Sequence, residues 1–289
     1  MVTKMYKPLE CRPDSYQEWY QQGNSLWEEG CYTEAIASYD KAIEYHPRSY
    51  WAWYQKGAAL EKLACYREAI QHYAQAARLE PNNYWAWYQQ GCILATELGQ
   101  YQQALECFAR ALDYHPQDYW SLYRTAEAYR QLQDYERAIE FYHRALELRP
   151  QDYWSWYRQG ETWQQQQKWS AAIDSYDRAL KIKPNDYWAW SQKGLIQQEL
   201  GNFARAIDCY TEALATETES AIGWYRQACC YAKLNKYNWA VTSLEKAIDL
   251  DPEKYLELAA SETIWSEYRK HPGFISLIEN KKAKLIVNG

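Results

Sequence analysis

Apolar and small residues recur along most of the chain with the three- and four-residue spacing of helix faces. Within residues 50–81, Trp53, Gly57 and Leu60 share one such face, and a second amphipathic run begins at Tyr66. A short turn around Ala64 and Cys65 separates the two runs. The pattern therefore predicts an antiparallel hairpin of two amphipathic helices.

The hairpin pattern repeats with proline as its marker. Successive markers lie 34 or 35 residues apart, with Thr218 in one place: Pro13, Pro47, Pro81, Pro116, Pro150, Pro184, Thr218 and Pro252. Two residues after the first seven markers stands a side chain able to cap a helix N-terminus: Ser15, Ser49, Asn83, Asp118, Asp152, Asp186 and Ser220. The spacing predicts seven repeats, at residues 16–49, 50–83, 84–118, 119–152, 153–186, 187–220 and 221–254.

The third repeat is one residue longer than its neighbours, and the ends differ from the repeats. The extra residue lies in Leu94–Leu98 or in the turn that follows, as a π-bulge or a longer turn. Residues 1–15 are expected to be an extension with the remnant of a helix. Residues 255–280 are expected to form capping helices, one over 255–270 and a short last one ending near Ile278, before a basic mobile tail at 281–289.

Equivalent positions of the repeats hold similar residues. The fourth position holds Trp19, Trp53, Trp87, Leu122, Trp156, Trp190 and Trp224, and the eighth holds Gly23, Gly57, Gly91, Ala126, Gly160, Gly194 and Ala228. Together with the alanines and prolines that follow, this series resembles the tetratricopeptide repeat (TPR), in a Trp- and Tyr-rich variant of the type common in cyanobacteria. The resemblance implies an all-α, right-handed superhelical α-solenoid of about seven hairpins with a C-terminal cap.

In TPR proteins the first helix of each repeat lines a concave groove, reached by its second, fifth, ninth and about its twelfth residue. Here the second position holds Trp51, Trp85, Trp120, Trp154 and Trp188, and the fifth holds Tyr54, Tyr88, Tyr123, Tyr157 and Tyr225. Two interpretations of the tryptophans stay open: they brace neighbouring repeats, or they contact a partner. The fourth-position tryptophans are expected to be inter-helix core.

An arginine directly follows three of the groove tyrosines: Arg124, Arg158 and Arg226. Each suits a carboxylate of a partner. The alternative is pairing within the helix, Arg124 with Glu127 and Arg158 with Glu161. TPR cochaperones that bind the acidic C-terminus of heat-shock chaperones use Lys and Asn at the fifth and ninth positions. Only Asn24 matches here, so that partner is not expected.

Composition narrows the function classes. The net charge of −6 and the pI of about 5.5 argue against nucleic acid. No apolar run is long enough for a membrane span, and no signal peptide is expected, so we expect a cytoplasmic protein. We also expect it to be a monomer. The eight cysteines lack metal or disulfide spacing, and no cofactor or catalytic motif is found.

These observations predict a non-catalytic scaffold or assembly factor that binds a peptide or helix of another protein in an aromatic groove. The alternatives are stacking of single-stranded nucleic acid or carbohydrate on the rings, and a purely structural spacer that uses its convex face.

Overall fold

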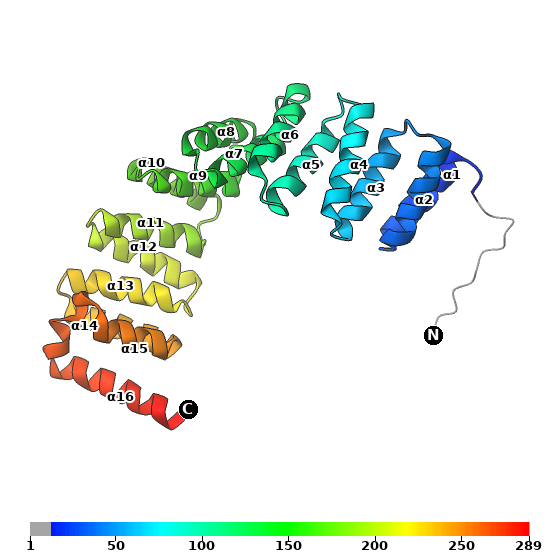
Figure 1. The fold of residues 1–289 in the computed structure, drawn as a ribbon. Helices are drawn as coiled ribbons and strands as arrows, with labels where there is room; N and C mark the ends of the chain where they lie inside the picture. Colours follow the sequence, from blue (N-terminus) through cyan, green and yellow to red (C-terminus); the bar gives the residue numbers. More distant parts are fainter. Residues whose placement is uncertain (1–12, 289) are drawn as a thin grey trace. The chain divides into compact units, whose positions relative to one another are not determined.

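The computed structural model describes residues 13–288, with side chains up to residue 283. Contacts divide the chain into two bodies, one ending at Leu148 and one beginning at Arg149. Each body is a stack of antiparallel helical hairpins (Figure 1). In the described residues all regular structure is helical. The predicted helical remnant before Pro13 lies outside them.

The N-terminal body contains the first four repeats, each with two helices. In chain order the helices are α1 (Tyr16–Glu28), α2 (Tyr32–Tyr45), α3 (Tyr50–Lys62), α4 (Tyr66–Leu79), α5 (Tyr84–Thr96), α6 (Tyr101–Tyr114), α7 (Tyr119–Gln131) and α8 (Tyr135–Leu148). The two helices of a repeat pack on each other, and each second helix up to α6 also packs on the first helix of the next repeat.

The C-terminal body contains the other three repeats and a cap. The repeats form α9 (Tyr153–Gln165), α10 (Trp169–Ile182), α11 (Tyr187–Glu199), α12 (Phe203–Thr216), α13 (Ala221–Lys233) and α14 (Tyr237–Leu250). The cap forms α15 (Pro252–Ser261), the 3₁₀ turns η2 (Thr263–Trp265) and η3 (Tyr268–Lys270), and α16 (Pro272–Asn288).

Six of the seven predicted N-caps accept a hydrogen bond from the backbone N–H three residues on: Ser15, Ser49, Asp118, Asp152, Asp186 and Ser220. Asn83 does not use its side chain in this way. Each cap satisfies one of the backbone donors that a helix start leaves without a partner, and so fixes where each repeat restarts.

The extra residue of the third repeat lies in the turn between its helices. Helix α5 ends at Thr96, and the Gln100 N–H donates to the Leu94 carbonyl six residues back. In the second repeat the equivalent bond runs from Cys65 to Leu60, five residues back. A longer turn therefore absorbs the insertion, and the π-bulge alternative is wrong.

The eighth-position glycines allow an aromatic ring of the second helix to lie against the first. A Cβ on Gly91 would lie 2.6 Å from Phe108, and one on Gly23 would lie 2.5 Å from Tyr39. Both rings are fully buried. Alanine holds this position twice: Ala126 packs in one cluster with the buried Tyr142 ring, whereas at Ala228 the second helix carries Leu244 instead of a ring. The small residue and the ring thus set how closely the two helices approach.

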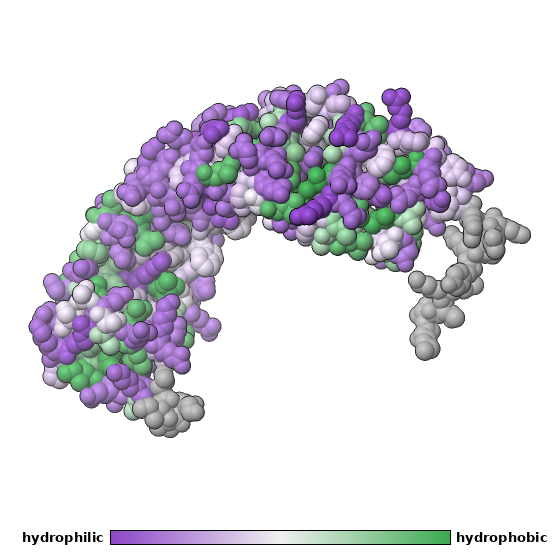
Figure 2. All heavy atoms as spheres, in the orientation of Figure 1, coloured by the Kyte–Doolittle hydropathy of each residue, from purple (hydrophilic) through white to green (hydrophobic). Residues whose placement is uncertain are grey.

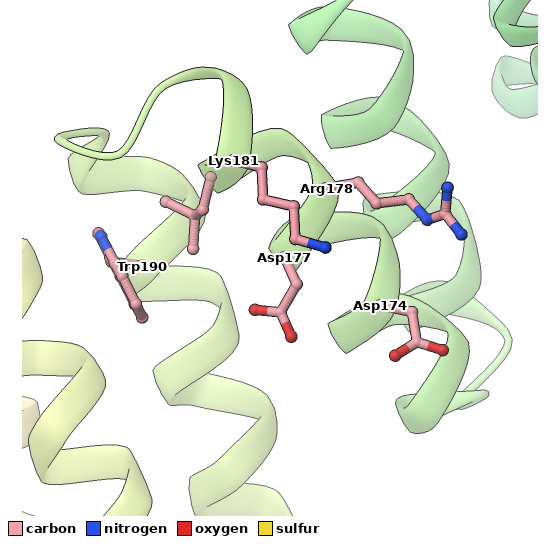
Figure 3. A pocket seen from close by; sticks show the side chains of 6 residues that line it. Asp174, Asp177, Arg178, Lys181 and Trp190 are labelled. Carbon is pink, nitrogen blue, oxygen red and sulfur yellow. The ribbon is translucent and has the colours of Figure 1, made fainter. Parts of the chain in front are cut away.

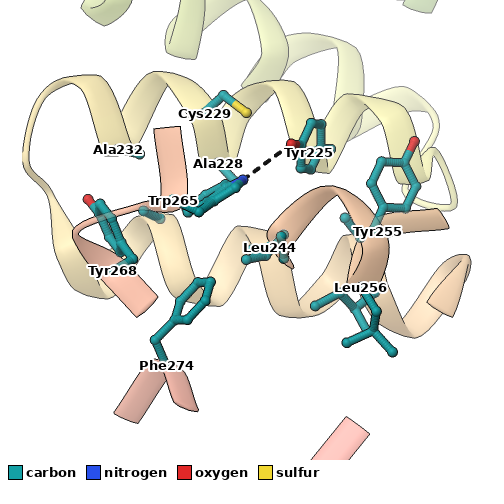
Figure 4. Packing of buried hydrophobic residues seen from close by; sticks show 14 residues of the cluster. Tyr225, Ala228, Cys229, Ala232, Leu244, Tyr255, Leu256, Trp265, Tyr268 and Phe274 are labelled. Atoms are coloured by element: carbon teal, nitrogen blue, oxygen red, sulfur yellow. Dashed lines mark hydrogen bonds between the residues drawn. The ribbon is translucent and has the colours of Figure 1, made fainter. Parts of the chain in front are cut away.

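The cap covers the apolar face of the last hairpin. Trp265 and Phe274 are fully buried against α13 and α14, and the Trp265 Nε1 donates to the Tyr225 hydroxyl at 3.2 Å (Figure 4). The predicted helix over 255–270 is corrected: α15 begins at Pro252 and ends at Ser261. Lys254 lies two residues after Pro252, where the repeats have their capping residue, but its ammonium cannot accept a hydrogen bond. Asp251 caps the helix instead, and Pro252 is the first helical residue.

Helix α16 also differs from the prediction. The last helix was expected to end near Ile278, with a mobile tail from 281, but α16 continues to Asn288. Lys281 is buried, and its ammonium contacts Glu245 at 2.9 Å and Asp249 at 2.5 Å. This ion pair with α14 repeats the pairing of Lys56 with Asp40 and of Lys193 with Asp177.

Candidate partner-binding surface

The five second-position tryptophans are exposed in both bodies. In the N-terminal body the exposed fractions are 46% for Trp51, 43% for Trp85 and 45% for Trp120. In the C-terminal body they are 51% for Trp154 and 61% for Trp188. We call these residues the N-terminal and C-terminal tryptophan rows. Their exposure favours the second of the two interpretations, because a ring that only braced two repeats would be buried.

Neighbouring tyrosines of the same helix hold these indoles in place. Trp51 meets Tyr50 edge-on at 5.0 Å between ring centroids and Tyr54 at 5.8 Å. In the C-terminal body the same arrangement places Trp154 at 5.1 Å from Tyr153. Edge-to-face pairs of this kind are favourable, and they reduce the rotamer freedom that an exposed ring would lose on binding.

The fourth-position tryptophans behave differently. They are partly buried, and in several repeats Nε1 donates to a backbone carbonyl of the turn six residues earlier. Trp53 donates to Pro47, Trp156 to Pro150 and Trp190 to Pro184, at 2.8–2.9 Å. Trp224 makes the same bond to Thr218, which explains how the array tolerates that substitution. These rings tie the turn to the first helix.

The fifth-position tyrosines are less accessible than predicted. Tyr54, Tyr88 and Tyr123 are partly buried, whereas Tyr157 and Tyr225 are buried. The expectation that Tyr157 and Tyr225 line an open strip is therefore corrected. Their rings fill space inside the hairpin stack.

Polar contacts explain the burial of these tyrosines. The Tyr157 hydroxyl bonds to Gln192 of the next repeat, and burial raises the pKa of Tyr157 to about 12. The Tyr225 hydroxyl donates to Glu262 of the cap at 2.7 Å. Tyr54 with Gln89, in the N-terminal body, follows the same pattern as Tyr157 with Gln192. In these pairs the fifth-position tyrosine of one repeat thus contacts the sixth-position glutamine of the next.

The three arginines have different partners. Arg158 pairs with Glu161 at 2.7 Å, as the alternative interpretation predicts. Arg226 donates to Ser191 Oγ at 3.5 Å. Arg124 does not pair with Glu127, because Glu127 accepts hydrogen bonds from Tyr142 and Arg130. Arg124 instead reaches back to Tyr88 of the preceding repeat.

A hollow on the second-helix side of the C-terminal body was not foreseen from the sequence. It measures about 530 Å³ and is lined by Asp174, Asp177, Arg178, Leu180, Lys181 and Trp190 (Figure 3). Lys193 bonds Asp177 at 2.6 Å beside it and lies over the Trp190 ring. The sequence feature that could have indicated this site is the 16-residue spacing of Asp177 and Lys193, which recurs in Asp40 and Lys56.

The buried thiols and the arrangement of possible metal ligands bear on whether the described residues can hold a reactive or metal-binding site. Burial raises the pKa of Cys209 to about 11 and that of Cys230 to about 12, so both thiols stay protonated and weakly reactive. Across residues 13–288 no three His, Cys, Asp or Glu side chains lie close enough together to hold a metal ion. Over the same range no helix has the length and apolar character needed to cross a bilayer.

Models of tetratricopeptide repeats match most of the helical part of the chain. The matched residues are 23–63, 52–83, 72–106, 93–153, 160–201, 189–217 and 221–254. The chain belongs to the tetratricopeptide repeat family. A search of the curated proteins found no match.

Solved TPR structures share the fold at low identity. The C-terminal part of a TPR repeat-containing protein from Cytophaga hutchinsonii matches with a TM-score of 0.71 and 16% identity, over 82% of this chain and 98% of that one. A MamA chain from Desulfovibrio magneticus, residue 41 to the end, matches with a TM-score of 0.56 and 21% identity, over 60% of this chain and 97% of that one. YrrB, described as a TPR protein with an unusual peptide-binding site, matches with a TM-score of 0.57 and 20% identity, over 66% of this chain and 98% of that one.

Proposed function

We propose that this TPR protein is a non-catalytic interaction scaffold that binds a peptide or helix of a partner protein along its tryptophan rows. The observation that carries the proposal is the exposure of five indoles at one position of successive repeats, each 43% to 61% accessible. Tryptophan is enriched among the residues that dominate binding energy at protein interfaces. Tetratricopeptide arrays serve as interaction scaffolds, and YrrB carries a peptide-binding site on the same fold.

The character of the surface and the contacts of the indoles support this function. Hydrophilic side chains cover most of the face of each body that Figure 2 shows, with smaller hydrophobic groups between them. Large exposed rings, held by neighbouring tyrosines, are the kind of anchor that a partner can bury at low entropic cost. The free thiols of the described cysteines fit a reducing compartment such as the cytoplasm.

Affinity capture from the source organism tests the proposal. The wild-type protein is compared with a double variant of the N-terminal row, Trp85→Ala with Trp120→Ala, and with a double variant of the C-terminal row, Trp154→Ala with Trp188→Ala. The control is Trp239→Ala, because Trp239 is 62% exposed but lies on α14, outside both rows.

Partners that bind the rows should be reduced about tenfold or more with at least one double variant, since losing two anchors costs several kcal/mol. The same partners should be retained by Trp239→Ala. Equal capture by all four proteins, each with an unchanged circular dichroism spectrum, would contradict the proposal.

A further inference from the structure

Arg124, at the sixth position of its first helix, lacks within the described residues the carboxylate partner that Arg158 has at the same position of the following repeat. That position holds Gln21, Gln55, Gln89, Arg124, Arg158, Gln192 and Arg226. Arg158 is neutralised by Glu161 at 2.7 Å. No carboxylate within the described part of the chain pairs with Arg124, and its Nε is buried without a hydrogen-bond partner. The N-terminal body thus holds a partly buried guanidinium whose charge no neighbouring carboxylate balances.

The contacts of Arg124 are aromatic and neutral. Its guanidinium bonds the Tyr88 hydroxyl of the preceding repeat, and Cys92 and Tyr123 are its other close neighbours. Burial raises the pKa of Cys92 to about 11, so that thiol is uncharged at neutral pH and does not compensate the guanidinium. Glu127, one turn further along α7, is held by Tyr142 and Arg130.

Arg124 also lies beside the N-terminal tryptophan row. Trp120 precedes it by four residues on α7, and residues four apart on a helix are neighbours on the same face. Trp120 is 45% exposed. A segment bound over the Trp120 indole would therefore place its next side chains within reach of the guanidinium.

We propose that Arg124 binds an Asp or Glu side chain of the partner, next to an apolar residue that covers Trp120. This inference rests on the proposed function and adds the chemistry of the partner. A guanidinium in a partly desolvated aromatic setting favours a carboxylate, with which it forms charge-assisted hydrogen bonds. A C-terminal carboxylate is not the occupant, because the fifth and ninth positions of the preceding repeat are Tyr88 and Cys92 rather than the Lys and Asn that grip such a terminus.

The probe is the dominant peptide selected on the full chain from a random 12-residue library displayed on phage. In this format the peptide has no free C-terminus, so only side-chain carboxylates are sampled. The peptide is then synthesised with an amidated C-terminus in two forms, one as selected and one with its Asp or Glu replaced by Asn or Gln. Both forms are titrated against the wild type and the variants.

The test variant is Arg124→Gln, because glutamine occupies the same position as Gln55 and Gln89 and bonds the preceding tyrosine there. The control is Arg110→Gln, which removes the same charge from the same body. Arg110 lies on α6, is 64% exposed and pairs only at 3.9 Å with Asp113. Melting curves establish that both variants are folded.

We expect the selected peptide to contain Asp or Glu. The form in which Asn or Gln replaces this residue should bind the wild type about tenfold or more weakly. Arg124→Gln should lower the affinity for the acidic peptide by a similar factor and leave the affinity for the Asn or Gln peptide unchanged. Arg110→Gln should change either affinity by less than about twofold. A selected peptide without Asp or Glu would overturn the inference. So would an equal loss of affinity in the wild type and in Arg124→Gln when Asn or Gln replaces the acidic residue of the peptide.

The proposed function is tested separately by Trp120→Ala and Trp85→Ala with the same two peptides. Unchanged affinity for those variants would reject the tryptophan row as the binding surface even if Arg124 and the carboxylate prove coupled. Weaker binding to the tryptophan variants, without coupling at Arg124, would keep the proposed function and reject the inference.

Discussion

Glycine and aromatic residues at fixed positions determine how closely the two helices of a repeat pack. The space available at these glycines is not uniform, however. A Cβ on Gly91 would lie 2.6 Å from the Phe108 ring, whereas one on Gly57 would lie 3.1 Å from Tyr73. Each ring is fully buried, so it has little room to move.

The difference predicts that the same substitution destabilises the protein at Gly91 and has little effect at Gly57. Gly91→Ala should lower the free energy of unfolding by about 1–3 kcal/mol, because Phe108 is overpacked. Gly57→Ala should be close to neutral, because the smaller overlap is offset by the helix propensity of alanine, about 1 kcal/mol better than glycine. Urea unfolding followed by circular dichroism measures both. A larger loss for Gly57→Ala than for Gly91→Ala would contradict this account of the packing.

Histidine 72 makes stability depend on pH. Its ring stacks on Trp53 at 5.4 Å, and burial, reinforced by the Lys56 ammonium, lowers its pKa to about 4, while Asp40 acts weakly in the other direction. The unfolded chain takes up this proton near pH 6.5. The unfolded state therefore binds more protons between these values, and stability falls as the pH drops from about 6.5 towards 4.

The expected loss between about pH 7 and about pH 5 is on the order of 1 kcal/mol, since partial exposure screens the effect. His72→Gln should reduce the pH dependence by this amount when urea unfolding is compared at the two pH values. An equally steep dependence in His72→Gln would show that other groups cause it.

At the scale of elements, local signals predicted most helices and missed those that depend on distant partners. The capping residues fixed six of seven repeat starts, since a hydroxyl or carboxylate acts on its own helix. Lys281 of α16 instead meets Glu245 and Asp249 of α14, more than 30 residues away in the sequence. No local pattern contains that ion pair.

The candidate surface was predictable to a similar extent. Helical spacing placed the second-position tryptophans on a face of their own, and they are exposed. It did not reveal that Tyr157 and Tyr225 are buried, because this depends on Gln192 and Glu262 in neighbouring elements. Exposure is set by what packs over a residue, and the sequence of one helix does not specify this.

The cap is an element whose removal has a measurable cost. Trp265 is fully buried among Tyr225, Tyr268 and Phe274. Trp265→Ala should lower the free energy of unfolding of the C-terminal body by about 3–5 kcal/mol, as expected for truncation of a buried aromatic side chain.

Trp239→Ala serves as the matched control for this prediction. It removes an indole that is 62% exposed and should change stability by less than about 0.5 kcal/mol. Hydrogen exchange resolved to α13 and α14 provides the measurement. Unchanged protection of these two helices in Trp265→Ala would show that the cap does not stabilise them.

At the scale of the whole molecule, the regular hairpins and the exposed indoles have different roles. Glycines, alanines, capping residues and fourth-position tryptophans maintain the repeat. The second-position tryptophans are between 43% and 61% exposed in the two bodies. A partner that uses the proposed surface must therefore cover these indoles.

Hydroxyl-radical footprinting of the protein, free and bound to its captured partner, tests that claim directly. Oxidation of Trp51, Trp85, Trp120, Trp154 and Trp188 is followed by mass spectrometry, with exposed Trp239 as the internal reference. We predict that at least two neighbouring tryptophans of one row become protected while Trp239 keeps its rate. Unchanged oxidation of both rows, with protection elsewhere on the molecule, would contradict the central claim.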